Sequence, residues 1–143
     1  TLGLDLLSED VTLKLFKEKL SNKRLQNQTL PKILMNQNIF SGIGNYLKAE
    51  ILYETKISPH RLLKDISEDE IKLLHTKCIR IINNSYKSGG ATLRNYSDIY
   101  LNSGKYVFVF KVYSQKIDSN GYKVIKEKTS DGRTTHWVPE IQK

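Results

Sequence analysis

The stretch "FSGIGNYLKAEILY", Phe40 to Tyr53, places two glycines and an asparagine directly before a run with helical spacing. Gly42 and Gly44 permit a positive φ or the close approach of another chain segment. Asn45 stands where the helix is expected to begin, so its side chain can cap that helix. The turn either serves packing alone, or presents free N–H groups and the positive end of a helix dipole to an anion such as phosphate.

Composition restricts the classes of protein to which this chain can belong. The chain has 143 residues, a formal charge of +8 and Lys and Arg spread along its length. This favours a folded basic surface, most often for nucleic acid and less often for anionic lipid; a merely soluble basic protein is the alternative. No apolar run approaches the roughly 18 residues of a membrane span, so no membrane partner is expected.

The single cysteine, Cys78, limits the chemistry further. An intrachain disulfide and a cysteine-rich metal site are both impossible, and a reducing intracellular setting fits. Cys78 falls on the apolar face of a predicted helix, where it is expected to belong to the core.

Helical patterns dominate the first part of the chain. Ser8 is expected to cap the first helix, and Pro31 to occupy the first turn of a short helix that ends near Gln37. A further helix is predicted from about Asn45 to Thr55. The S-E-D-E sequence of residues 67–70 is a capping box that opens a long helix. The apolar face of this last helix is predicted to comprise Ile71, Leu74, Cys78, Ile82 and Tyr86.

From Tyr106 the pattern changes to that of strands. "YVFVFKVY" (106–113) and "YKVIKEKT" (122–129) are rich in β-branched and aromatic residues. Asn120-Gly121 and Asp131-Gly132 are hairpin turn signals. The predicted fold is therefore mainly α with a small antiparallel β-hairpin appendage, divided into residues 1–105 and 106–143.

Several segments resemble the formamidopyrimidine/endonuclease VIII (Fpg/Nei) family of DNA glycosylases. "FSGIGNYLKAEILYETKISPHR" (40–61) resembles the helix-two-turn-helix motif of that family. "LGLDLLSEDV" (2–11) resembles its linker, "LPKILMNQ" (30–37) the helix before the glycine turn, and "GGATLRNY" (89–96) the loop that approaches the everted base. The resemblance covers nearly the whole chain.

The resemblance implies base excision repair by a bifunctional glycosylase and AP lyase. Such enzymes flip an oxidised base out of the duplex, and an N-terminal proline amine, assisted by a glutamate, attacks the sugar. This chain begins with Thr1, and Pro31, Pro59 and Pro139 are all internal. It is therefore expected to be the DNA-binding C-terminal half, inactive without the N-terminal catalytic domain. "GNYL" is similar to the Nei branch, which prefers oxidised pyrimidines.

The end of the chain resembles a zincless finger, as found in a vertebrate Nei-like protein and in viral and plant relatives. Arg133 and Gln142 keep the register of the family's zinc finger, but Val138 and Ile141 stand where two cysteines would be. A Cys₄ zinc site needs four thiolates. The resemblance thus implies no metal and no cofactor.

The resemblance also implies the DNA-contacting residues. Phosphate contacts are expected from the glycine turn, from an arginine at a hairpin tip and from a basic loop, and base contacts from the glycine-led loop. The expected phosphate-contacting residues are Gly42, Gly44, Asn45, Arg133, Lys23 and Arg24, and the lesion-loop residues are Thr92, Arg94 and Tyr96. Without the resemblance, Arg133 would be a solvated turn residue. For Lys23 and Arg24 two alternatives stay open: they are general phosphate contacts or plain solvated charge.

Trp137 and Glu50 are two further residues whose surroundings the sequence predicts. Trp137 is expected to pack the finger rather than stack on a base, and Glu50 to be exposed or to face the missing domain.

Two functions are alternatives to the glycosylase half: a stand-alone helix-two-turn-helix nucleic-acid-binding module and a partner-docking domain. The expected partner is duplex DNA with an oxidised base or abasic site, bound by a monomer. The expected location is intracellular: the nucleus in a eukaryote, the cytoplasm in a bacterium or for a virus.

Overall fold

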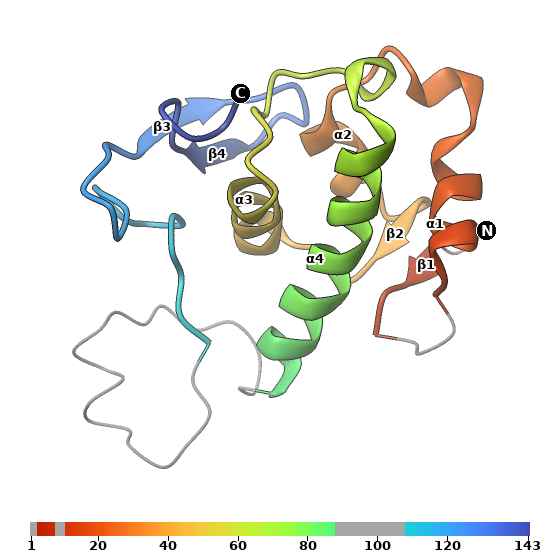
Figure 1. Ribbon diagram of the computed structural model, residues 1–143, viewed down its shortest axis with the longest axis horizontal. Helices are drawn as coiled ribbons and strands as arrows, with labels where there is room; N and C mark the ends of the chain where they lie inside the picture. The colour runs from red at the N-terminus through yellow and green to blue at the C-terminus, as the bar shows by residue number, and fades with distance from the viewer. Residues whose placement is uncertain (1–2, 8–10, 88–107) are drawn as a thin grey trace.

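The computed structural model describes residues 3–7, 11–87 and 108–143, and every structural statement below concerns these residues (Figure 1). The chain is mainly helical, with two small two-stranded sheets. In chain order the elements are β1 (Leu4–Asp5), α1 (Leu13–Leu20), η1 (Lys23–Leu25), α2 (Leu30–Leu34), β2 (Phe40–Ser41), α3 (Asn45–Glu54), η2 (Leu63–Asp65), α4 (Glu68–Lys87), β3 (Ile125–Lys128) and β4 (Thr134–Trp137). In this described part, no helix is long and apolar enough to cross a membrane.

The first helix begins later than its sequence suggested. α1 starts after Thr12, whose hydroxyl accepts a hydrogen bond from the Leu15 N–H at 3.2 Å. The predicted Ser8 cap is therefore wrong, because a second hydroxyl residue nearer the apolar repeat caps the helix instead. Ser8 itself lies outside the described residues.

The short helix α2 confirms Pro31 in its first turn but ends at Leu34 rather than near Gln37. Gln37 instead uses its side-chain amide to bind the glycine turn that follows. Its Nε2 donates to the Ile43 carbonyl at 3.2 Å, and its Oε1 accepts from the Gly42 N–H at 3.3 Å. The loss of a helical turn thus provides partners for the backbone of the turn.

The capping box of α4 is confirmed. The Glu70 N–H donates to the Ser67 Oγ at 3.1 Å, and the Ser67 N–H donates to the Glu70 Oε1 at 2.9 Å. The buried face contains Leu74, Cys78, Ile81, Ile82 and Ser85. Tyr86 is 70% exposed, so its predicted place on that face is wrong. At about 100° per residue, position 86 is rotated some 80° away from position 78, whereas position 85 lies almost above it.

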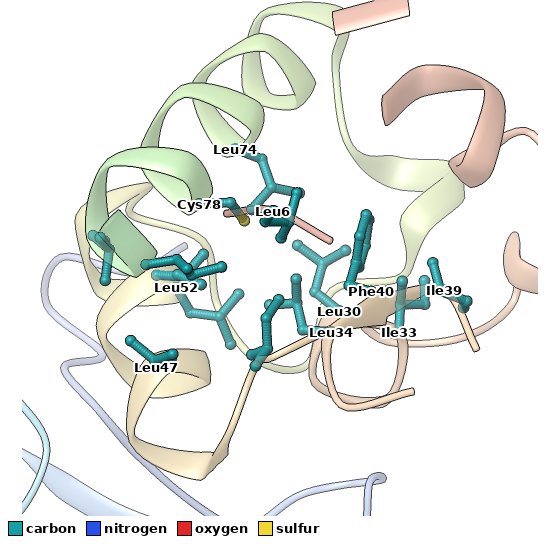
Figure 2. Packing of buried hydrophobic residues seen from close by; sticks show 14 of the residues in the cluster. Leu6, Leu30, Ile33, Leu34, Ile39, Phe40, Leu47, Leu52, Leu74 and Cys78 are labelled. Carbon is teal, nitrogen blue, oxygen red and sulfur yellow. The ribbon is translucent and has the colours of Figure 1, made fainter. Parts of the chain in front are cut away.

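Helix α3 lies between α4 and the β3–β4 hairpin (Figure 1). It is buried on several sides, including at Leu47, Ala49, Ile51 and Leu52. Leu47, Ile51 and Leu52 join apolar residues of α1, α2 and α4 in the main core, part of which is drawn in Figure 2. Cys78 is fully buried there, as predicted. Ala49 packs instead in a second cluster, with Val112, Val124 and Val138. The central position of α3 lets one helix contact both the helical part and the hairpin.

The strand predicted over residues 106–113 is wrong for its described part, 108–113, which forms no ladder. The Glu50 carboxylate accepts hydrogen bonds from the N–H groups of Lys111, Val112 and Tyr113 at 2.7, 2.9 and 2.8 Å. Those donors are therefore not available to a neighbouring strand. Glu50 is only 2% exposed, which overturns both predictions made for it.

The hairpin at Asp131-Gly132 is confirmed. β3 and β4 pair antiparallel, with Lys128 opposite Thr134 and Ile125 opposite Trp137. Gly132 has a φ of +83°, which favours glycine at this turn. Of the predicted strand 122–129, residues 125–128 form β3. Lys123 pairs separately, in an isolated antiparallel bridge to Ile117 across the predicted turn at Asn120-Gly121.

Candidate nucleic-acid interface

The glycine turn places one glycine in a conformation that other residues rarely adopt. Gly42 has a φ of +91°. Gly44 is extended, with φ −97° and ψ −178°, and it is the N-cap of α3. Its glycine identity is therefore not required by backbone conformation, and a Cβ built there would approach only the Tyr46 ring, at 3.4 Å. The left-handed requirement predicted for this turn falls on Gly42.

Asn45 is the first residue of α3 rather than its cap, so its predicted capping role is wrong. Its Nδ2 instead donates to the carbonyl of Thr134 in β4 at 3.0 Å. Its Oδ1 is buried and has no hydrogen-bond partner among the described residues. The amide is used to join the start of α3 to the hairpin because glycine already occupies the capping position.

The first turn of α3 retains free backbone donors. The first intrahelical bond runs from the Lys48 N–H to the Gly44 carbonyl at 2.9 Å, so the three preceding N–H groups have no acceptor within the helix. Gly44 supplies no side-chain cap, and the turn contains no acidic residue. With the helix dipole, this turn is suited to bind an anion.

The tip of the β3–β4 hairpin packs against that turn. The Lys48 Nζ lies 2.6 Å from the Asp131 Oδ2, and their side chains are 0% and 2% exposed. Asp131 also accepts a hydrogen bond from Thr129, whose hydroxyl lies 2.8 Å from that of Thr135. The hairpin tip is thereby fixed to α3 by polar contacts inside the protein.

Arg133 is exposed directly beyond the hairpin turn. Its neighbour Thr134 accepts the hydrogen bond from Asn45, so Arg133 lies beside the start of α3. Burial lowers the pKa of the Lys48 ammonium; Asp131 counteracts this shift, while the nearby Arg133 guanidinium adds to it. Among the ion pairs of the described residues, none includes Arg133. Its fork of donors is therefore available to an external anion.

The remaining predicted site residues are not joined to this cluster. Lys23 and Arg24 are exposed on η1, and within the described part of the chain they form no hydrogen bond or ion pair with α3 or the hairpin. Thr92, Arg94 and Tyr96 lie outside the described residues. The structure therefore brings together Gly44, Asn45 and Arg133 from the predicted set.

Sequence reasoning missed Lys48 and Asp131. They are separated by 83 positions, and neither belongs to a charge pattern within its own element. From its own local sequence, a lysine in a helix or an aspartate in a turn is predicted to be exposed. Only the docking of the hairpin on α3 buries both.

Apolar and hydrogen-bonded groups hold the end of the chain. Trp137 is 9% exposed and Val138 fully buried, which confirms the packing role predicted for Trp137. The Gln142 Oε1 accepts from the Val138 N–H at 2.7 Å, and its Nε2 donates to the Ile57 carbonyl at 3.0 Å. Gln142 thus links the segment after β4 to the helical part.

Within the described part of the chain, no group of three or more His, Cys, Asp or Glu side chains could hold a metal. We expect elemental analysis of the purified protein to find zinc far below one atom per chain, because the finger has no thiolates. Near-stoichiometric zinc that persists after treatment with a chelator would contradict this prediction.

Comparisons with known proteins match both parts of the chain. Residues 2–97 match the formamidopyrimidine-DNA glycosylase H2TH domain, and residues 97–143 match the formamidopyrimidine-DNA glycosylase C-terminal domain. A formamidopyrimidine-DNA glycosylase of Prochlorococcus marinus subsp. pastoris is 32% identical over all of this chain and 49% of the relative. One from Streptococcus mutans is 30% identical over 95% of this chain and 50% of the relative. The chain therefore spans about half the length of the curated relatives it matches.

The solved structures that this chain resembles are also DNA glycosylases. A viral DNA glycosylase is 26% identical with a TM-score of 0.79, covering 97% of this chain and 49% of that one. Lactococcus lactis Fpg, solved in complex with DNA containing an abasic site, is 30% identical with a TM-score of 0.79 and covers 99% of this chain and 52% of that one. A complex of the same glycosylase with Fapy-dG-containing DNA is 31% identical with the same TM-score.

Proposed function

The chain belongs to the formamidopyrimidine-DNA glycosylase family, and on that premise we propose that it binds duplex DNA at or near a damaged base. The observation that carries the proposal is the junction of two anion-binding groups from distant parts of the chain. The start of α3, with its free N–H groups, and the exposed residue Arg133 come close in space because Asn45 bonds to Thr134, the residue after Arg133. Both groups suit DNA phosphates, which account for much of the affinity of such proteins.

We further propose that the chain acts as part of a bifunctional glycosylase and AP lyase. Relatives about twice as long carry the glycosylase name, and the solved relatives bind abasic-site or Fapy-dG DNA. Residues of this chain would then bind the DNA phosphates, while the catalytic groups would belong to the N-terminal domain of the longer relatives. We propose oxidised pyrimidines as substrates, because "GNYL" is similar to the Nei branch of the family. We also propose that the protein is a monomer and that it acts on intracellular DNA.

A stand-alone nucleic-acid-binding module remains the alternative function. The match of residues 97–143 to the C-terminal domain of the family supports the glycosylase interpretation instead, because such a module has no need of that domain. Binding that favours an abasic-site duplex over an undamaged duplex would support the glycosylase interpretation. Equal affinity for both would support the module.

Arg133→Ala tests the proposed contact with phosphate. We expect this variant to fold normally, because an exposed charge contributes at most about 1 kcal/mol to stability. Its affinity for an abasic-site duplex should fall about tenfold, the scale of a charge-assisted hydrogen bond. The slope of log K against log salt should become shallower by about 0.9, the share of one phosphate.

The measurement is a binding titration over a salt series from about 50 to about 200 mM. Arg80→Ala, at another exposed arginine on α4, is the matched control and should change the slope less. Arg133→Lys should recover part of the affinity, since lysine keeps the charge but not the bidentate geometry. Equal slopes for wild type and Arg133→Ala would show that the hairpin tip does not contact DNA.

Asn45→Ala separates a structural role from a DNA-binding role. Loss of the Asn45–Thr134 bond should lower the free energy of unfolding by about 1 kcal/mol. If the second N–H of the same amide binds phosphate, duplex affinity should also fall about tenfold. Asn38→Ala, at an exposed asparagine before the turn, is the control. A variant that is less stable but binds DNA as wild type does would limit Asn45 to joining α3 and the hairpin.

A further inference from the structure

The buried ion pair between Lys48 and Asp131 lies where α3 and the hairpin meet. Its atoms are 2.6 Å apart, and neither side chain is more than 2% exposed. Removing two charges from water costs several kcal/mol per ion by general estimates, so buried pairs often stabilise a protein no better than apolar residues would. Stability alone therefore gives no reason for a charged pair at this position.

Two polar contacts between α3 and the hairpin lie on either side of Arg133 along the chain. Asp131, two residues before Arg133, binds Lys48. Thr134, the residue after Arg133, accepts from Asn45. Lys48 lies one helical turn beyond Asn45, so both contacts start from the same end of α3. The backbone of Arg133 is thus held on both sides against one helical turn.

Of the three charged residues Lys48, Asp131 and Arg133, only Arg133 has an exposed side chain. Lys48 and Arg133 are close enough for the guanidinium to disfavour the charged form of Lys48. The carboxylate of Asp131 compensates the buried ammonium. Of these three residues, Arg133 is thus the one whose charge is accessible to an external anion, and its neighbour Thr134 is bonded to the first turn of α3.

We infer that Lys48 and Asp131 are positioning residues, which hold the Arg133 guanidinium at a fixed place relative to the first turn of α3 so that both contact the same DNA backbone. This inference rests on the proposed function. It assigns to the pair a role in DNA affinity, exerted through Arg133, that is separate from its role in folding.

The test replaces the pair by neutral residues and then measures the effect of Arg133→Ala. Lys48→Met with Asp131→Asn removes both charges at similar volume, and such replacements of buried pairs often leave a protein folded. In the wild-type background, Arg133→Ala should reduce affinity for an abasic-site duplex about tenfold and flatten the salt slope by about 0.9. In the neutral-pair background, which is the variant carrying Lys48→Met and Asp131→Asn, Arg133→Ala should reduce affinity by about twofold or less. The effects of substitutions at residues that act through one another are not additive.

A surface pair provides the matched control. Lys17 and Glu68 are also 2.6 Å apart but are exposed. In the background of Lys17→Met with Glu68→Gln, Arg133→Ala should keep its full effect on affinity and slope. If the variant carrying Lys48→Met and Asp131→Asn does not fold, Lys48→Gln with Asp131→Asn replaces it in the same measurement. The latter variant keeps a hydrogen bond between two neutral side chains.

The outcomes distinguish this inference from the proposed function. Full, additive loss on Arg133→Ala in the neutral-pair background would overturn the positioning role and leave the proposed function standing. Wild-type protein that binds no duplex, or binds it without salt dependence, would overturn the proposed function itself, and the positioning role with it. A loss confined to the background with the intact pair supports both.

Discussion

Replacing Glu50 by glutamine is expected to lower the free energy of unfolding by about 2–3 kcal/mol, because a buried backbone donor would lose its acceptor. One carboxylate oxygen of Glu50 accepts from Lys111, and the other accepts from both Val112 and Tyr113. Glutamine offers only one acceptor oxygen. Its NH₂ group must then face at least one of the three N–H groups.

Glu50→Ala should be worse, with a loss of about 5 kcal/mol, since all three N–H groups would lose their partner and a cavity would form. Burial raises the pKa of Glu50, and the three N–H groups act in the opposite direction. The side chain is therefore costly to place in the core and is retained through its contacts with residues 111–113.

Urea unfolding of each variant measures this prediction. Glu54→Gln, one turn further along α3, is the matched control, because Glu54 binds the ammonium groups of Lys77 and Lys111 rather than backbone N–H groups. We expect a loss of about 1 kcal/mol or less for this control. Equal losses for Glu50→Gln and Glu54→Gln would show that the backbone contacts of Glu50 contribute nothing special.

The features predicted correctly from the sequence depend on residues close together in the chain. The capping box at Ser67 and Glu70, Pro31 in the first turn of α2 and the turn at Gly132 each need only a few neighbours. The same applies to the glycine turn before α3, which the family resemblance also identified. Local patterns of this kind fix turns and helix ends before any tertiary contact is considered.

The features that were missed depend on distant partners. Residues 108–113 have the composition of a strand, but a carboxylate 61 to 63 positions away takes three of their N–H groups. Asn45 was expected to cap its own helix, yet its amide reaches a carbonyl 89 positions away. Strand propensity reflects fit to a half-buried pleated surface, so tertiary contacts override it. No pattern within either segment reports such a partner.

Removing one partner of the Lys48–Asp131 pair is expected to have the second large effect. Lys48→Met should lower the free energy of unfolding at neutral pH by about 3–5 kcal/mol, because it leaves a carboxylate buried without a cation. In the wild type, burial acts to raise the pKa of Asp131, but hydrogen bonds from Lys48 and Thr129 outweigh it and hold that pKa below its ordinary value. The ionised form of Asp131 therefore stabilises the fold above the ordinary pKa of an aspartate, about 4, and this contribution is lost as the pH falls further. Burial lowers the pKa of Lys48, so its charged form offsets part of this gain.

The variant should show the opposite dependence on pH. Without Lys48, burial is expected to raise the pKa of Asp131 above that of the unfolded chain, so protonation on acidification removes the penalty. The difference in unfolding free energy between wild type and Lys48→Met should thus be largest near neutral pH and shrink towards about pH 4. Urea unfolding at several pH values measures it. Lys17→Met is the control, because the exposed Lys17–Glu68 pair has the same N–O distance; it should leave the unfolding midpoint almost unchanged at every pH. If the loss of unfolding free energy caused by Lys48→Met does not vary with pH, Lys48 contributes through packing and not through its charge.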